Sequence, residues 1–473
     1  RDLYDRFGIN AEDRAAMLVL DSVDFPIIFW GSLKAGVIPI PLNTLLSVDL
    51  YKIILNDSKA KVLFISQELW ESVSEILVET THLKVVFIMG GNDINDAPIQ
   101  TLSFNKELSK SKIKPCIQAK DDDYAFWLYS SGSTGPPKGV RHVHGSLKAT
   151  SDTYGKNILQ IKEDDIVFSV AKMFFAYGLG NNMTFPMSVG ATTYVYSGRP
   201  TPHSVLESLE ASKATIFCGV PTLYAALLSH IGDKCPNAMK DIRHCISAGE
   251  ALPEDIGQRW KNIIGKDILD GVGSTEMLHI FLSNSLGDIV YGTSGKAVDG
   301  YELKLVDEND CELGAGEIGE LLVKGESSAD SYWTQRAKTR TTFQGEWTRT
   351  GNKYTKDGTN RYTYCGRTDD MFKVSGIWVS PFEIEQALIS NNLVLESAVI
   401  AHQDNEGLYK PKAFVVLKDG KHNEDLKEVL KQVVKDKIGK WKYPRWIQFV
   451  AELPKTATGK IQRFKLRELD EWI

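Results

Sequence analysis

The stretch YAFWLYSSGSTGPPKG, residues 124–139, joins a continuously apolar run to a loop rich in glycine and hydroxyl side chains. The apolar run is typical of a strand that is buried on both faces. The glycines can adopt positive φ and bring backbone N–H groups close to an anion, while the hydroxyl groups and one cation add further donors. We therefore predict a nucleotide phosphate site at Ser130, Ser131, Gly132, Ser133, Thr134, Gly135 and Lys138. The loop is not a Walker A loop, because Gly139 rather than Ser or Thr follows Lys138.

Similar apolar runs recur in the first half of the chain, at residues 14–20, 61–66, 84–90 and 215–220. Helix-like segments lie between several of them, and the segment 221–230 begins with a proline, which suits the first turn of a helix. Alternation of buried strands with helices predicts parallel sheets in an α/β fold.

The pattern changes after about residue 340, where the sequence becomes turn-rich and charged. Strand-like segments follow at 397–403 and 412–418, and apolar residues recur at helical spacing at Leu426, Val429, Leu430 and Val433. We predict a domain boundary near Asp369, with a large N-terminal domain over 1–368 and a small α+β domain over 369–473.

The bulk composition excludes several classes of protein. The net charge of −6 gives no general attraction to nucleic acid or to an anionic membrane. The most apolar stretch, residues 25–42, is interrupted by Gly31, Lys34, Gly36, Pro39 and Pro41, so it does not predict a spanning helix. Six cysteines show no C-x-x-C pair, which favours reduced thiols and a cytoplasmic location. The chain starts without Met, which is consistent with a missing N-terminal segment.

Four further motifs accompany the glycine-rich loop: DGVGSTEM (270–277), EWTRTGN (346–352), GRTDDMFKVSG (366–376) and PKTATGKIQR (454–463). In order and spacing these five stretches resemble the adenylate-forming superfamily, which includes acyl-CoA synthetases, over essentially the whole chain. The resemblance implies a large N-terminal domain of two sheets and a barrel-like subdomain, followed by a small mobile C-terminal domain.

A narrower resemblance, to benzoate–CoA ligases, rests on AKMFFAYGLGN (171–181), GVPTLY (219–224), SAGEALP (247–253) and DGVGSTEMLHIF (270–281). It implies an enzyme that uses ATP, Mg²⁺ and CoA to convert an aryl carboxylic acid to its CoA thioester through an acyl-adenylate. We expect no nucleic-acid or membrane partner, and a monomer or homodimer.

The resemblance also implies roles for single residues. The expected catalytic residues are Lys460, Thr275 and Glu276, with Glu276 also the Mg²⁺ ligand. The ATP site would add Ala248, Gly249, Glu250, Asp270, Gly271, Asn352 and Arg367 to the glycine-rich loop. The acid pocket would comprise Ala176, Tyr177, Gly178, Ala248, Gly273, His279 and Ile280, with a hinge at Asp369 and a CoA contact at Gly376.

Less specific interpretations compete with several of these roles. Taken singly, Lys460 is a typical solvated lysine, and Tyr177 and His279 are typical core residues. Thr275 and Glu276 also suit a helix N-cap followed by an acidic first turn. His142 and His144 suggest a metal pair, but no third ligand stands nearby in the sequence, so we interpret both as loop residues.

Two departures from the family pattern bear on function. The usual N-terminal segment is absent, and the usual T-G-D motif reads Thr350-Gly351-Asn352. A neutral amide gives up a charge-assisted hydrogen bond to the ribose, so we predict ATP binding weaker by roughly 1–2 kcal/mol. Three alternatives stay open. The substrate could be another acid (a hydroxy-, amino- or halobenzoate, cyclohexenecarboxylate or a medium-chain fatty acid), the chain could load a carrier protein, or it could bind nucleotide without catalysis.

Overall fold

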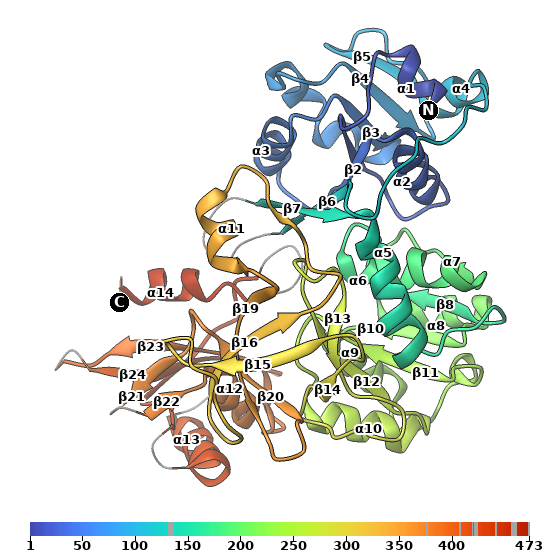
Figure 1. Cartoon of the computed structure of the whole chain (residues 1–473). Coiled ribbons are helices and arrows are strands. Elements are labelled where there is room, and N and C mark those ends of the chain that lie inside the picture. Colours follow the sequence, from blue (N-terminus) through green and yellow to red (C-terminus); the bar gives the residue numbers. More distant parts are fainter. Residues whose placement is uncertain are drawn as a thin grey trace. The chain divides into compact units, whose positions relative to one another are not determined.

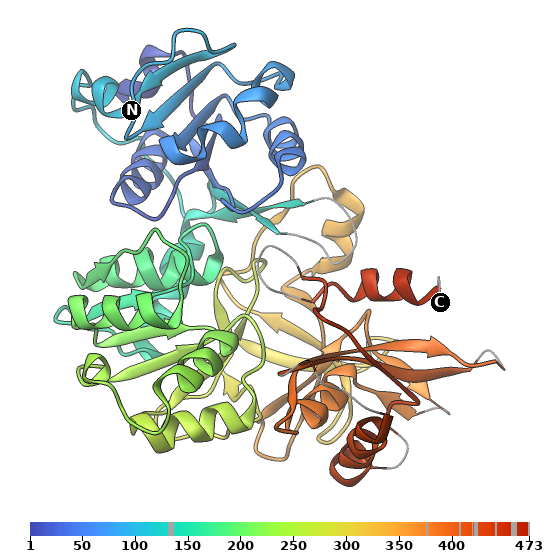
Figure 2. The same cartoon turned by 180° about the vertical axis from the view of Figure 1, so that it is seen from behind.

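The computed structural model describes residues 1–130, 137–374, 377–405, 408–418, 420, 424–439, 442–455 and 461–471 (Figures 1 and 2). The chain divides into two compact units. Unit 1 comprises Arg1–Leu303 and Val323–Arg349, and unit 2 comprises Lys304–Leu322 and Thr350–Ile473. The α/β fold is confirmed. The predicted domain boundary near Asp369, between residues 1–368 and 369–473, stays a prediction.

The first sheet of unit 1 has five parallel strands in the order β2-β1-β3-β4-β5. They are β1 (Arg14–Leu18), β2 (Ile38–Pro41), β3 (Val62–Ser66), β4 (Val85–Met89) and β5 (Gln100–Ser103). Alternate residues of β1 enter two separate apolar clusters, one shared with α2 (Asp24–Ala35) and one with α3 (Val48–Ser58). Burial on both faces therefore explains the continuous apolar runs, and the strands predicted at 14–20, 61–66 and 84–90 are confirmed.

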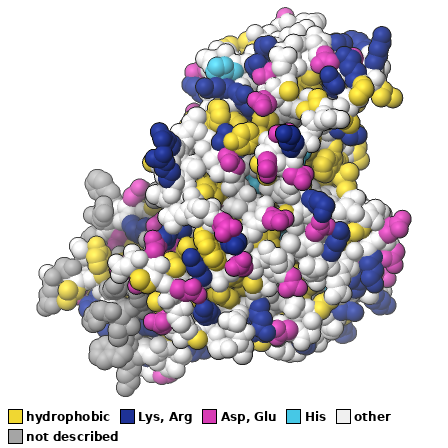
Figure 3. Space-filling model, in the orientation of Figure 1, with side chains coloured by type: hydrophobic (Ala, Val, Ile, Leu, Met, Phe, Trp, Pro, Cys, Tyr) yellow, Lys and Arg dark blue, Asp and Glu magenta, His cyan; other side chains and the backbone are white. Residues whose placement is uncertain are grey.

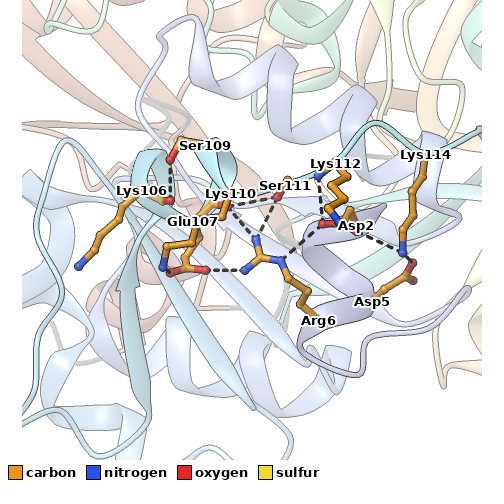
Figure 4. Close-up of polar contacts among 10 residues, drawn as sticks. All are labelled: Asp2, Asp5, Arg6, Lys106, Glu107, Ser109, Lys110, Ser111, Lys112 and Lys114. Carbon is orange, nitrogen blue, oxygen red and sulfur yellow. Dashed lines mark hydrogen bonds and ion pairs between the residues drawn. The ribbon is translucent and has the colours of Figure 1, made fainter.

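A network of ion pairs holds the N-terminal helix α1 (Asp2–Arg6) against α4 (Phe104–Ser109) and the segment that follows it (Figure 4). Arg6 donates to the buried Glu107 at 2.7 Å and to the Ser111 hydroxyl at 3.0 Å. Lys114 donates to Asp5 at 2.7 Å. Each exposed pair contributes little alone, but several shared charges fix this helix at the edge of the sheet.

The second sheet of unit 1 has seven strands in the order β14-β13-β12-β11-β10-β8-β9. Five neighbouring strands, β9, β8, β10, β11 and β12, are parallel to one another. The strands β13 and β14 are antiparallel to their neighbours. Their bounds are β8 (Ile166–Ser169), β9 (Thr192–Tyr194), β10 (Ile216–Gly219), β11 (His244–Ser247), β12 (Ile268–Gly273), β13 (Ile280–Ser283) and β14 (Lys296–Ala297). The strand predicted at 215–220 is β10, and the helix predicted at 221–230 is α9 (Pro221–Ile231).

The other α-helices of unit 1 are α5 (His144–Thr150), α6 (Ala176–Leu179), α7 (Phe185–Val189), α8 (Pro202–Ser212), α10 (Glu254–Ile264) and α11 (Arg336–Thr342). Two π-helical segments, η3 (Ser151–Ile158) and η4 (Gly180–Thr184), continue α5 and α6. Short 3₁₀ segments are η1 (Gln67–Ser72), η2 (Ser74–Glu79) and η5 (Asn237–Met239). Among the described residues, no helix is both long and apolar enough to cross a membrane.

A three-stranded antiparallel sheet, in the order β17-β7-β6, completes unit 1. Its strands are β6 (Tyr124–Ser130), β7 (Lys138–Val143) and β17 (Ser331–Tyr332). The run 124–130 is thus a strand, as predicted, but its inclusion among the parallel strands was wrong. Phe126 and Leu128 pack into one apolar cluster and Trp127 into the other, so the run is buried on both faces although its partner is antiparallel.

The division between the two units passes through a five-stranded sheet, so several strands of this sheet belong to unit 2. That sheet contains β15 (Glu302–Val306), β16 (Gly319–Lys324), β18 (Phe343–Gln344), β19 (Trp347–Lys356) and β20 (Tyr362–Arg367). Unit 2 also holds the hairpin β21 (Phe372–Val374) and β22 (Ile377–Val379), and the sheet β23 (Val394–Gln403), β24 (Tyr409–Leu417) and β25 (Trp446–Phe449). The helices are α12 (Pro381–Ile389), α13 (Glu424–Ile438) and α14 (Arg463–Glu471).

The predicted C-terminal strands and helix are confirmed as β23, β24 and α13. The predicted apolar face of α13 was wrong in detail. Leu430 and Val434 are fully buried, whereas Val429 is 50% exposed. On the face drawn in Figure 3, basic and acidic side chains are interspersed.

Candidate active site

The glycine-rich loop connects β6 to β7. Ser130 and Lys138 pair across this hairpin, so they mark the two ends of the loop. Of the predicted loop residues, Ser131, Gly132, Ser133, Thr134 and Gly135 lie outside the described residues, as do Lys460 and Gly376.

Lys138 and Glu276 meet at one end of this hairpin. Lys138 is buried, and its Nζ lies 3.8 Å from Oε1 of Glu276 and 4.4 Å from the ring centroid of Tyr332. The Tyr332 hydroxyl donates a 2.8 Å hydrogen bond to the same Glu276 oxygen. Burial, and then the neighbouring Glu276 carboxylate, raise the pKa of Tyr332, so its hydroxyl keeps its proton and remains a donor. The structure therefore brings the predicted phosphate-binding lysine to the predicted Mg²⁺ ligand.

Thr275 and Glu276 lie in a tight turn, residues 274–279, between β12 and β13. The Ser274 hydroxyl accepts a 3.1 Å hydrogen bond from the main-chain N–H of Met277, and the chain then enters β13 without forming a helix. The competing interpretation of a helix N-cap is therefore wrong. Leu278 adopts φ +64° although it is buried, a conformation that costs free energy for a branched residue and is common at functional sites.

The predicted acid-pocket residues come from three places that meet at the carboxyl ends of β10, β11 and β12. The Tyr177 hydroxyl, from α6, donates to the main-chain oxygen of Gly219 at 3.2 Å, with the oxygen of Ile246 at 3.4 Å. The Tyr177 and His279 rings lie 5.8 Å apart. Ala248 follows β11 and is buried. The turn lies between Gly273 and Ile280, and its last residue is His279. Carboxyl ends of parallel strands are the usual place for ligands in such sheets.

Aromatic rings surround His279. Its ring centroid lies 5.0 Å from that of Tyr154 and 4.5 Å from that of Phe185. Burial lowers the pKa of His279 to about 3, and the nearby backbone of Tyr177 opposes this shift only weakly. Neither ring nitrogen has a hydrogen-bond partner of good geometry in the described part of the chain. At neutral pH the ring is therefore uncharged.

Glycines allow the backbone segments of this pocket to approach one another. A Cβ added to Gly273 would lie 2.5 Å from the main-chain oxygen of His279. A Cβ added to Gly178 would lie 2.5 Å from the main-chain oxygen of Ala171 and closer still to that of Lys172. Backbone atoms cannot move aside easily, so both positions require glycine.

The predicted adenine segment follows β11. Ala248 is buried, whereas Gly249, with φ +95°, and Glu250 are exposed. Asp270 lies behind this segment, 3% exposed, and its Oδ2 accepts a 3.4 Å hydrogen bond from the main-chain N–H of Leu252. Burial raises the pKa of Asp270 to about 8. Its carboxyl group therefore faces the interior, and contact of Asp270 with a nucleotide would involve its main chain.

The predicted ribose residues lie in unit 2. Asn352, in β19, pairs directly with Arg367, in β20, across an antiparallel ladder. Gly351 beside it has φ +68°. Asp369 is exposed in the turn that follows β20. The structure thus places Asn352 and Arg367 side by side, and their contact with the ribose stays a prediction.

Residues 3–333 match the AMP-binding enzyme family, and residues 383–460 match the AMP-binding enzyme C-terminal domain. The chain belongs to the AMP-binding enzyme family. The 4-hydroxybenzoate–CoA/benzoate–CoA ligase of Rhodopseudomonas palustris is 50% identical over 98% of this chain and 86% of that protein. The benzoate–CoA ligase of Thauera aromatica is also 50% identical, over 98% of this chain and 87% of that protein.

Solved structures agree with this membership. An anthranilate CoA ligase in complex with anthranoyl-AMP superposes with a TM-score of 0.92 at 41% identity, covering 100% of this chain and 90% of that one. A benzoate CoA ligase from Burkholderia xenovorans superposes with a TM-score of 0.88 at 44% identity, covering 98% of this chain and 91% of that one.

Two histidines near the site, both interpreted as loop residues, were misinterpreted from the sequence. His142 is not a loop residue but lies in β7, fully buried, and its Nε2 is 2.9 Å from the main-chain oxygen of Thr275. His144 begins α5. Among the described residues, no group of three His, Cys, Asp or Glu side chains could hold a metal ion. β7 reads KGVRHV, so no feature of its sequence set His142 apart from the other polar residues of the strand.

Proposed function

We propose that this member of the AMP-binding enzyme family is an acid–CoA ligase for benzoate or a closely related aryl carboxylic acid. The observation that carries the proposal is the turn 274–279. It presents Glu276 beside Lys138, and three residues later it presents His279 among aromatic rings that include Tyr177. One short segment would therefore serve both a nucleotide site and an acid site, as an acyl-adenylate requires.

The proposed reaction has two steps. The carboxylate oxygen attacks the α-phosphorus of ATP, the bond to the β-phosphate breaks, and pyrophosphate leaves. The thiolate of CoA then attacks the carbonyl carbon of the acyl-adenylate, and AMP leaves. In the first step negative charge gathers on the phosphate oxygens, so cations and N–H donors lower the barrier. We assign this role to Lys138, Lys460, Thr275 and the loop residues 130–135.

Glu276 suits Mg²⁺ because a carboxylate is a hard oxygen ligand and Mg²⁺ is usually held by one or two carboxylates, water and substrate phosphates. Bound there, Mg²⁺ would neutralise phosphate charge. Tyr332 donates to one oxygen of Glu276, which orients the carboxylate.

The pocket favours a flat neutral ring. Gly178 and Gly273 admit no side chain, and the surrounding rings of Tyr154, Tyr177 and Phe185 give an apolar lining near His279. The remaining assignments rest on the family pattern. Asn352 and Arg367 would bind the ribose, Asp369 would act as a hinge between the two steps, and Gly376 would contact the pantetheine arm of CoA. A cytoplasmic location and a monomeric or dimeric state stay predictions from the sequence.

The test is acid-dependent release of pyrophosphate from ATP by the full chain. The acids are benzoate, 4-hydroxybenzoate, anthranilate, cyclohexenecarboxylate and octanoate. We expect the highest kcat/KM with benzoate or one of the substituted benzoates. A higher value with octanoate would refute the aryl assignment. Faster release of AMP with a holo-carrier protein than with CoA would instead identify a carrier-loading enzyme.

Lys460→Ala tests the division between the two steps. This variant should lose pyrophosphate release by ~100-fold or more, as expected when one group that stabilises the transition state is removed. It should still form thioester from supplied benzoyl-AMP and CoA. Lys455→Ala is the matched control, since Lys455 lies in the same segment and pairs with Glu396. Equal loss of both steps in Lys460→Ala would contradict the proposed role.

A further inference from the structure

Three consecutive main-chain oxygens of the turn 274–279, those of Thr275, Glu276 and Met277, each accept a hydrogen bond from outside the turn. In that order the donors are His142 Nε2 at 2.9 Å, the Ala329 N–H at 2.7 Å and the Ser327 hydroxyl at 2.8 Å. Two other segments, β7 and residues 327–329, therefore hold the middle of the turn.

The turn needs such support because its own geometry is unfavourable. Leu278 is held at φ +64°, which the surroundings must enforce. Inside the turn, the N–H of Leu278 donates to Thr275 at 3.2 Å and the N–H of His279 donates to Met277 at 2.8 Å. Relaxation of Leu278 would turn Glu276 and His279, which lie on either side of it, away from their present positions.

His142 is unusual among the three donors because its hydrogen bond comes from a fully buried ring. The ring stacks on Phe126 at 5.0 Å and 16°. Burial lowers the pKa of His142 to about 4, so the ring is neutral, and the Thr275 carbonyl fixes the proton on Nε2. The other nitrogen, Nδ1, has no hydrogen-bond partner within the described residues. If His142 only filled space, an apolar side chain would stabilise the fold more, because burial of the unpaired Nδ1 costs free energy.

We propose that His142 is a positioning residue for the active site. It ties β7, the strand that leaves the glycine-rich loop, to the turn that carries Thr275, Glu276 and His279. The proposal rests on the proposed function, because it gives the turn a role in both the nucleotide site and the acid site. Loss of the hydrogen bond should therefore lower kcat/KM for ATP and for the acid together.

Two variants of the full chain test this role. His142→Leu keeps an apolar side chain but removes the donor, and His142→Gln keeps an N–H near the position of Nε2. His144→Gln is the matched control, since His144 is a half-buried histidine at the start of α5. The readouts are KM for ATP, KM for benzoate, kcat, the thermal midpoint and amide exchange of the peptide that contains Leu278 and His279.

We expect His142→Leu to lose about tenfold in kcat/KM for both substrates, the factor of one net hydrogen bond. Amide exchange at the turn should quicken by a similar factor, while the thermal midpoint changes little. His142→Gln should recover most of both losses. Activity and exchange of His142→Leu within twofold of the parent would overturn the proposal, as would a loss confined to one substrate.

If His142→Leu does not fold, His142→Phe decides the matter, because it keeps a ring against Phe126 and still removes the donor to Thr275. An unchanged turn in that variant, by exchange and by kcat/KM, would equally overturn the proposal. Exchange needs no substrate. A parent that releases no pyrophosphate with any acid would therefore refute the proposed function, while exchange would still decide whether His142 holds the turn.

Discussion

Asp270→Asn should change how the stability of the protein depends on pH. Asp270 lies in β12 at the back of the nucleotide segment, and its Oδ1 has no hydrogen-bond partner among the described residues. Burial raises the pKa of its carboxyl group from 3.8 to about 8, although the hydrogen bond from the backbone of Leu252 opposes the shift. At neutral pH the group is therefore largely protonated, and asparagine resembles this protonated form in shape and charge.

The size of the expected change in the free energy of unfolding follows from the pKa shift of Asp270. Because the folded state binds the proton more tightly than the unfolded state, the proton stabilises the fold fully below pH 3.8. This contribution is lost as the pH rises to about 8. Each pH unit in that window lowers the free energy of unfolding by about 1.4 kcal/mol, and the whole window by roughly 5–6 kcal/mol. Asparagine has no proton to lose, so the variant should lack this component.

The assay is urea unfolding of the parent and of Asp270→Asn at half-unit steps from pH 5 to pH 9. The free energy of unfolding of the variant, relative to the parent, should rise by about 1.4 kcal/mol per pH unit up to pH 8 and then level off. Asp299→Asn, at an exposed aspartate, is the control and should run parallel to the parent. Parallel curves for Asp270→Asn as well would refute the reasoning. A large rise in its KM for ATP would show that the carboxyl group itself contacts nucleotide.

Two further substitutions test the pocket and the ribose site. Asn352→Asp should lower KM for ATP by roughly 5- to 30-fold, because it restores a charged acceptor opposite Arg367. The control is Asn360→Asp, in the turn before β20, which should leave KM for ATP unchanged. An unchanged KM would show that Asn352 does not bind the ribose. Gly178→Ala should raise KM for benzoate by at least tenfold or destabilise unit 1, since its Cβ would strike two main-chain oxygens. Gly31→Ala, in the middle of α2 with open space around it, should instead stabilise the protein by up to about 1 kcal/mol, so equal behaviour of the two variants would contradict the packing argument.

The sequence predicted the strands well because burial on both faces leaves a continuous apolar run. The same rule failed to give strand direction at 124–130. Phe126 and Trp127 enter different apolar clusters, so this antiparallel strand is as buried as a parallel one. Continuous apolarity therefore reports burial and not the direction of the neighbouring strand. In α13, adjacent pairs of apolar residues offered two possible faces, and only packing selected Leu430 and Val434 over Val429.

The motifs predicted which residues gather at the site, but not what holds them there. Thr275, Glu276 and His279 were found as a motif. His142 and Ser327, which bind the main chain of Thr275 and Met277, carry no motif of their own. A hydrogen bond from a side chain to a distant carbonyl leaves no periodic trace in a sequence. Only the fold shows that β7 reaches the turn between β12 and β13.

The charges near the pocket also bear on which acids it accepts. Burial keeps His279 neutral by lowering its pKa to about 3, and it keeps Asp270 largely protonated by raising its pKa to about 8. The ring of the acid would therefore bind among neutral groups, and its carboxylate must find its positive partners at the phosphate side of the turn, where Lys138 lies. A second carboxylate on the ring would have to lose its hydration without a compensating cation, at a cost of several kcal/mol. This pocket should therefore select aryl acids that carry a single charge.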